Sequence, residues 1–157
     1  MITIQINKKF ADRISSELLE ETALKIFSQL KIDPLTDLSV LIDTDAVLKK
    51  LNRLYRGFDQ PTDVLSFESN EINPETGASS LGDIAISFPT AEKQAAEASH
   101  PVENEIILLL VHAILHLTGY DHNTKEEKQQ MWAEQQSVID HLKININRIS
   151  GDEDFHD

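Results

Sequence analysis

Apolar residues alternate with polar ones at the start of the chain, and short apolar segments recur further along it. Every second position of residues 2–6 is isoleucine, the period of a strand with one buried face. DLSVLID (37–43) is typical of a second strand, and DVLSF (63–67) and LGDIAIS (81–87) are flanked by turn-forming residues. The pattern predicts four strands, the last two joined as a hairpin with a long mobile loop.

Helical spacing of apolar residues follows each of the first two strands. From Asp12 onward, the residues on one helical face are Leu19, Ala23, Ile26, Phe27 and Leu30. Asp43 or Thr44 can cap a second helix, which runs to Gly57 because glycine is favoured just past a helix end.

Three further helices are predicted in the second half of the chain. Residues 89–100 form a short one, and Pro101 suits the first position of the next. That helix, ending at about Thr118, is apolar on nearly every side and should form the buried centre of the domain. Thr124 and Glu127 have the S/T-x-x-E spacing that caps a last helix.

These elements predict one α/β (α+β) domain, with a small mixed sheet of about four strands and about five helices. The chain has 157 residues, enough for one domain with a core but short for two. We place the domain at residues 1–149 and expect an acidic, flexible tail at 150–157.

Composition limits the chemistry and the partners. There is no cysteine, so a metal must be bound by His, Asp or Glu. The formal charge of −13 disfavours loose binding to nucleic acid unless a local basic patch exists. No apolar stretch reaches the about 20 residues of a membrane span, and the N-terminus lacks a secretory pattern, so a cytoplasmic protein is expected.

The segment HAILHLTGYDH, residues 112–122, has the spacing of a metal site. His112 and His116 are four residues apart and face the same way on a helix. Gly119 can turn the chain back and bring His122 into place as a third ligand. Three imidazoles that leave one position for water are typical of a catalytic zinc ion. The alternative is that these are ordinary core histidines; His100, His141 and His156 fit no such pattern and are expected at the surface.

The same segment resembles the metzincin peptidase motif H-E-x-x-H-x-x-G-x-x-H in spacing and predicts a similar helix and turn. Ala113 occupies the position of the glutamate that moves protons during peptide hydrolysis. Peptidase activity is therefore disfavoured, whereas RNA cleavage needs only an activated hydroxyl and a cation near the phosphate.

Cations for binding phosphate are concentrated before Gly57. Lys49, Arg53 and Arg56 recur at helical spacing, and Arg56 lies at the helix end, where its guanidinium can bind a phosphate with two hydrogen bonds. A solvated helix face is the alternative for this stripe. Asp121, next to His122, is expected to orient His112 or His116 by a hydrogen bond.

Taken together, NRLYR (52–56), TDVLSF (62–67), LGDIAIS and HAILHLTGYDH resemble the bacterial YbeY endoribonucleases, which mature ribosomal RNA. That family usually has glycine where this chain has Ala113. The resemblance implies one Zn²⁺ on His112, His116 and His122 and a functional Arg56. It also implies cleavage of single-stranded RNA in 16S rRNA 3′-end maturation and ribosome quality control, with the small ribosomal subunit as a partner and neither membrane nor DNA.

Two other hypotheses remain open. The chain could be a non-catalytic ribosome-assembly factor in which zinc only ties the turn at Gly119 to the helix. A peptidase would require another acidic residue in place of the missing glutamate.

Overall fold

The computed structural model describes residues 1–144 and 146, and four strands form its single sheet. They are β1 (Ile2–Ile6), β2 (Asp37–Asp43), β3 (Val64–Glu68) and β4 (Ser80–Ser87). The spatial order is β1-β2-β4-β3, in which β2 is parallel to β1 and β4, and β3 is antiparallel to β4. The prediction of a small mixed sheet is confirmed, and β3 is one of its two edges.

The two faces of the sheet differ in what covers them. Along β2, Leu38, Val40 and Ile42 are buried and alternate with half-buried residues that point the other way. The buried set belongs to the main core, together with residues of α1, α4 and α5. A smaller cluster on the opposite face contains Leu48 of α2 and Leu65 of β3.

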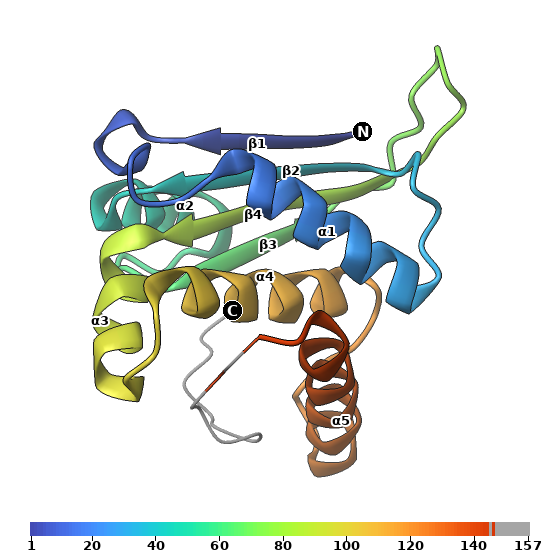
Figure 1. Ribbon diagram of the computed structural model, residues 1–157. Helices are drawn as coiled ribbons and strands as arrows, with labels where there is room; N and C mark the ends of the chain where they lie inside the picture. Colours follow the sequence, from blue (N-terminus) through green and yellow to red (C-terminus); the bar gives the residue numbers. More distant parts are fainter. Residues whose placement is uncertain (145, 147–157) are drawn as a thin grey trace.

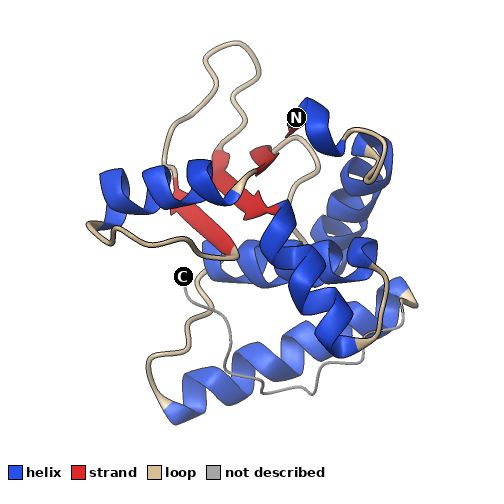
Figure 2. Ribbon diagram, turned by 90° about the vertical axis from the view of Figure 1, so that its left-hand side faces the viewer, coloured by secondary structure: helices blue, strands red, loops and turns tan. Residues whose placement is uncertain are grey.

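The five predicted helices are present, and four of them lie on the main-core side. These are α1 (Ser16–Leu30), α3 (Phe88–Ala98), α4 (Val102–Leu117) and α5 (Lys125–Leu142). Figure 1 shows α4 running along the sheet beneath β3 and β4, with α1 on the β1 side. In Figure 2, α2 (Asp45–Arg56) lies apart from α1, α4 and α5, on the other side of the strands.

Two predicted helix starts are corrected by local capping. The first helix begins at Ser16 rather than Asp12, because the Ser15 side chain accepts a hydrogen bond from the backbone N of Leu18. A short 3-10 helix, η1 (Lys8–Phe10), precedes it. Pro101 is the N-cap of α4 rather than its first residue.

The ends of α2 agree with the prediction from the sequence, but the position of one side chain does not. Thr44 is the N-cap, accepting from Val47 N at 3.3 Å, and Gly57 is the left-handed C-cap. The helical spacing of Leu48, Leu51 and Tyr55 predicts that all three face inward, but Tyr55 is 68% exposed. It lies beyond the edge of the small cluster and contacts the ring of Phe67, with centroids 5.3 Å apart.

The predicted hairpin is β3 and β4, and its long loop (residues 69–79) extends away from the sheet (Figure 1). Gly82 in β4 has a φ of +145°, and a Cβ there would lie 2.2 Å from the carbonyl oxygen of Phe67. The two strands approach so closely at this point that only glycine fits.

Among the described residues, no helix is long and apolar enough to cross a membrane. The predicted tail, 150–157, lies outside the described residues, as does the end of the domain expected at 149.

Candidate metal centre

The two helical histidines lie on α4, the most buried helix. Its apolar residues run without a polar face from Ile106 to Leu115, apart from His112, which is only 1% exposed. His116, one turn later, is half-buried. The helix that the sequence predicted as the centre of the domain therefore presents both imidazoles from a position held by the core.

A tight turn follows α4 and brings the third histidine back. The backbone N of Gly119 donates to His116 O at 3.2 Å, and Tyr120 N donates to Leu115 O at 3.1 Å. Gly119 has a φ of +106°, a conformation that side chains disfavour, and this reverses the chain toward the helix. The predicted chain reversal at Gly119 is confirmed.

The turn assembles a group of potential metal ligands. One ligand atom each from His116, Asp121 and His122 lies within 4.8 Å of the others. The rings of His112 and His122 are stacked with centroids 5.9 Å apart, and those of His116 and His122 are 6.0 Å apart. The structure thus gathers the three predicted histidines and adds the Asp121 carboxylate to the closest set.

His112 is oriented by a residue that the sequence did not single out. Its Nδ1 lies 3.3 Å from Oε1 of Gln135 on α5, and Gln135 is only 7% exposed. An amide oxygen can only accept, so Nδ1 carries the proton and Nε2 is the nitrogen with the lone pair. The sequence signal for Gln135 was weak: one polar residue on the otherwise apolar face of the last helix.

The donors present fit a divalent ion of borderline softness. Imidazole nitrogen and carboxylate oxygen are both ligands of zinc and of related first-row ions. Nδ1 of His116 is buried and has no hydrogen-bond partner among the described residues, which is costly for a polar atom unless another species satisfies it. His116, Asp121 and His122 could therefore hold a metal ion, with His112 beside them.

Asp121 also organises the turn itself. Its Oδ1 accepts from the backbone N of His122, and its Oδ2 accepts from Asn123 Nδ2, both at 2.8 Å. These hydrogen bonds run to its own loop rather than to His112, whose Nδ1 faces Gln135. The side chain thus positions His122 through the backbone.

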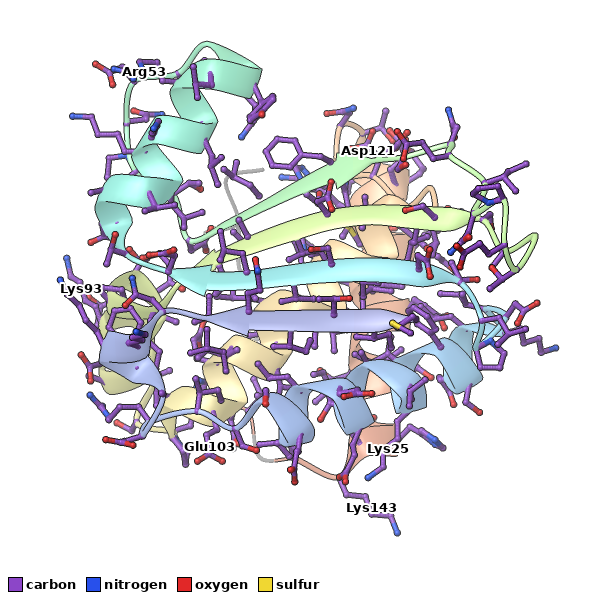
Figure 3. The ribbon with its side chains drawn as sticks, turned by 90° about the horizontal axis from the view of Figure 1, so that it is seen from above. Lys25, Arg53, Lys93, Glu103, Asp121 and Lys143 are labelled. Atoms are coloured by element: carbon purple, nitrogen blue, oxygen red, sulfur yellow. The ribbon has the colours of Figure 1, made fainter. Side chains whose placement is uncertain are left out.

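The predicted phosphate-binding cations lie on α2. Lys49, Arg53 and Arg56 are all exposed, and the guanidinium carbon of Arg56 is 5.2 Å from the ring centroid of Phe58. Figure 3 shows Arg53 and Asp121 at the same edge of the sheet, that of β3. Since β3 contacts both α2 and α4, this edge strand links the basic helix to the histidine helix.

One histidine outside the site departs from expectation. His100, predicted at the surface, is 7% exposed, and its Nε2 lies 2.8 Å from Oε1 of Glu105, with both side chains fully buried. The pair joins the end of α3 to the first turn of α4 and explains how two ionisable groups occupy the core. His141 is exposed as predicted, and His156 lies outside the described residues.

Comparison with known proteins gives one consistent family. A family model described as "Endoribonuclease YbeY" matches residues 2–143. A curated protein of that name from Persephonella marina is 42% identical over 150 residues, covering 94% of this chain and 97% of the relative. One from Dehalococcoides mccartyi is 38% identical and covers 90% of each chain. A solution structure of a Thermotoga maritima protein superposes with a TM-score of 0.58 at 29% identity, covering 91% of this chain and 92% of that one.

Proposed function

The chain belongs to the YbeY family, and from this premise we propose that it is a single-strand-specific metallo-endoribonuclease. One observation carries the proposal: His116, Asp121 and His122 converge within 4.8 Å beside His112, on a chain whose relatives are named endoribonucleases. The metal is proposed to be a single zinc ion held by His112, His116 and His122, because three imidazoles with an open fourth position are a common ligand set of catalytic zinc.

Each residue has a distinct part in the proposed reaction. A zinc ion, when bound, supplies positive charge near the reacting phosphate and acidifies the attacking water or ribose hydroxyl. Gln135 keeps the lone pair of His112 on Nε2, and Asp121 holds the backbone of His122 in place. Arg56 is proposed to bind the phosphate through its guanidinium and to balance the charge that develops there.

The surroundings of the histidines favour phosphodiester over peptide cleavage. Ala113 is fully buried between the two helical histidines, at the position where zinc peptidases carry their glutamate. Asp121, the acid grouped with His116 and His122, already accepts hydrogen bonds on both of its oxygens from the loop. A carboxylate committed in this way is a poor carrier of protons from water to a leaving amine.

The proposed substrate is ribosomal RNA, in maturation of the 16S rRNA 3′ end and in ribosome quality control, in the cytoplasm. The basic face of Lys49, Arg53 and Arg56 supports local contact with RNA in a chain of charge −13. That bulk charge is why we infer that the small ribosomal subunit presents the RNA to the site. We also propose that residues 1–149 form a single endoribonuclease domain.

The test is cleavage of a defined single-stranded RNA by protein of measured zinc content. The parent should cut, whereas His116→Ala and His122→Ala should lose both bound zinc and activity. Arg56→Ala should keep its zinc and lose most of its activity, and Lys31→Ala, an exposed cation after α1, is the matched control.

The outcome also separates the alternatives. Zinc that raises the melting temperature without any turnover on RNA would favour the non-catalytic assembly factor. Equal cleavage by the parent and all three variants would show that a contaminant is responsible. Cleavage of a peptide library by the parent would establish the peptidase instead.

A further inference from the structure

A small cavity lies at the connection between α2 and β3, outside the group of histidines. Its volume is about 290 Å³, close to the lower end of small-molecule sites, which are about 300–1,000 Å³. The residues that line it are Asn52, Arg56, Phe58, Gln60, Pro61 and Thr62. The lining combines an aromatic ring, two amides, a hydroxyl and a cation, which is an unusual set for a simple loop.

One polar atom in this lining lacks a partner. Asn52 is 2% exposed, and its Nδ2 donates to the carbonyl oxygen of Gln60 at 2.9 Å. Because a carbonyl can only accept, this bond settles which way the amide points. The remaining atom, Oδ1, is a buried acceptor with no hydrogen-bond partner in the part of the chain that the structure describes. A ligand that carries an N–H group would satisfy it.

An exposed aromatic ring stands at the same cavity. Phe58 is 51% exposed and belongs to neither hydrophobic cluster of the described residues. The guanidinium of Arg56 lies over the ring, 5.2 Å from Cζ to the centroid. Water-exposed phenylalanine beside a cation is the arrangement on which bases of single-stranded nucleic acids stack.

We propose that this cavity, here named the Phe58 pocket, binds one nucleobase of the RNA substrate. The base stacks on Phe58, its N–H edge faces Asn52 Oδ1 and the Gln60 amide, and Arg56 binds the adjoining phosphate. Phe58 is then a positioning and specificity residue for RNA cleavage. This assignment rests on the proposed function. Adenine, cytosine and guanine can donate to the orphaned acceptor from an exocyclic amino group, whereas uracil can donate only from its ring N3–H.

The first experiment measures base binding without any cleavage. The zinc-loaded parent is titrated with adenosine 5′-monophosphate and with ribose 5-phosphate, and the backbone amide NMR shifts of residues 57–60 and 62 are followed. We expect saturable shifts with the nucleotide and much weaker binding of ribose 5-phosphate. Phe58→Ala should weaken nucleotide binding at least about fivefold, the lower end expected for one lost stacking contact. Leu35→Ala, which removes another exposed apolar residue, 64% exposed and located before β2, should bind like the parent.

Equal binding of the two ligands, or unchanged affinity in Phe58→Ala, would overturn the proposal and leave a phosphate contact at Arg56 alone. Since this titration does not depend on turnover, it can succeed even if the ribonuclease assignment fails, and the reverse also holds.

The second experiment uses the cleavage reaction to separate positioning from folding. Phe58→Ala should raise KM for a short single-stranded RNA at least about fivefold with kcat changed much less, and Phe58→Tyr should restore KM because it keeps the ring face. An unchanged KM in Phe58→Ala, or a loss in Phe58→Tyr equal to that in Phe58→Ala, would contradict stacking. Equal melting temperatures of the three proteins serve as the folding control.

Discussion

Oε1 of Gln135 on α5 lies 3.3 Å from Nδ1 of His112 on α4, deep between the two helices. This contact fixes the tautomer of a buried imidazole. The residue that makes it, Gln135, follows His112 in the chain by 23 positions. Hydrogen bonds of this kind orient metal-binding histidines and raise their basicity. The last helix is therefore part of the candidate metal centre although it supplies no ligand.

Replacing the Gln135 acceptor should weaken metal binding. Gln135→Met keeps the length of the side chain, but its thioether accepts a hydrogen bond from Nδ1 only weakly, so we expect zinc affinity to fall about 10- to 100-fold. Gln135→Glu keeps the acceptor and should bind zinc at least as well as Gln135→Met. The measurement is competition with a chromophoric chelator, and Gln129→Met, at an exposed position of α5, is the control. Identical affinities for Gln135→Met and the control would show that the contact is irrelevant to the metal.

Two substitutions at Asp121 distinguish a positioning carboxylate from a ligand. Asp121→Asn keeps an Oδ1 acceptor for the backbone N of His122, so zinc affinity should fall less than about tenfold. Asp121→Ala releases the turn and should cost clearly more. The same chelator competition measures both. If Asp121→Asn binds zinc as poorly as His122→Ala, the carboxylate binds the ion directly.

Glycine substitutions should rank by what the new Cβ meets. In Gly77→Ala the added Cβ has nothing within 4 Å, so the only cost is the positive φ of the backbone. The free energy of unfolding should fall by about 1 kcal/mol. Gly82→Ala adds a clash 2.2 Å from Phe67 O and should cost about 3 kcal/mol or more. Urea unfolding measures both values. Comparable losses would mean that β3 and β4 can separate at this point without penalty.

The buried pair of His100 and Glu105 should contribute strongly to stability. His100→Ala removes the imidazole from a fully buried carboxylate, so the free energy of unfolding should fall by about 3–5 kcal/mol. Exposed His141→Ala should change it by less than about 0.5 kcal/mol. Adding Glu105→Leu to His100→Ala should recover part of the loss, because the buried charge is then gone. Urea denaturation of the three variants tests this, and a double variant weaker than His100→Ala would contradict the explanation.

Local patterns predicted most elements correctly. The strands and helices follow from apolar periodicity, and the capping residues Thr44 and Thr124 were recognisable from residue type and spacing. The predicted start at Asp12 was wrong because the cap at Ser15 decides where the helix begins. A cap acts within a single turn, and a broad apolar face does not show in which turn it lies. The inward position predicted for Tyr55 was wrong, because helical spacing cannot show how far the sheet that covers the helix extends.

The sequence by itself determined the spacing of His112, His116 and His122 and the glycine turn between them, because a helix repeat and a positive φ are local properties of the backbone. Only the tertiary structure decided which side chains surround them. Gln135 contacts His112, and His100 contacts Glu105, because their elements pack together, and no local periodicity encodes those partners. Phe58 contacts Arg56 because of the course of the loop after α2, which depends on the sheet beneath it. Contacts between elements arise when those elements pack, so they were absent from the pattern that predicted the elements.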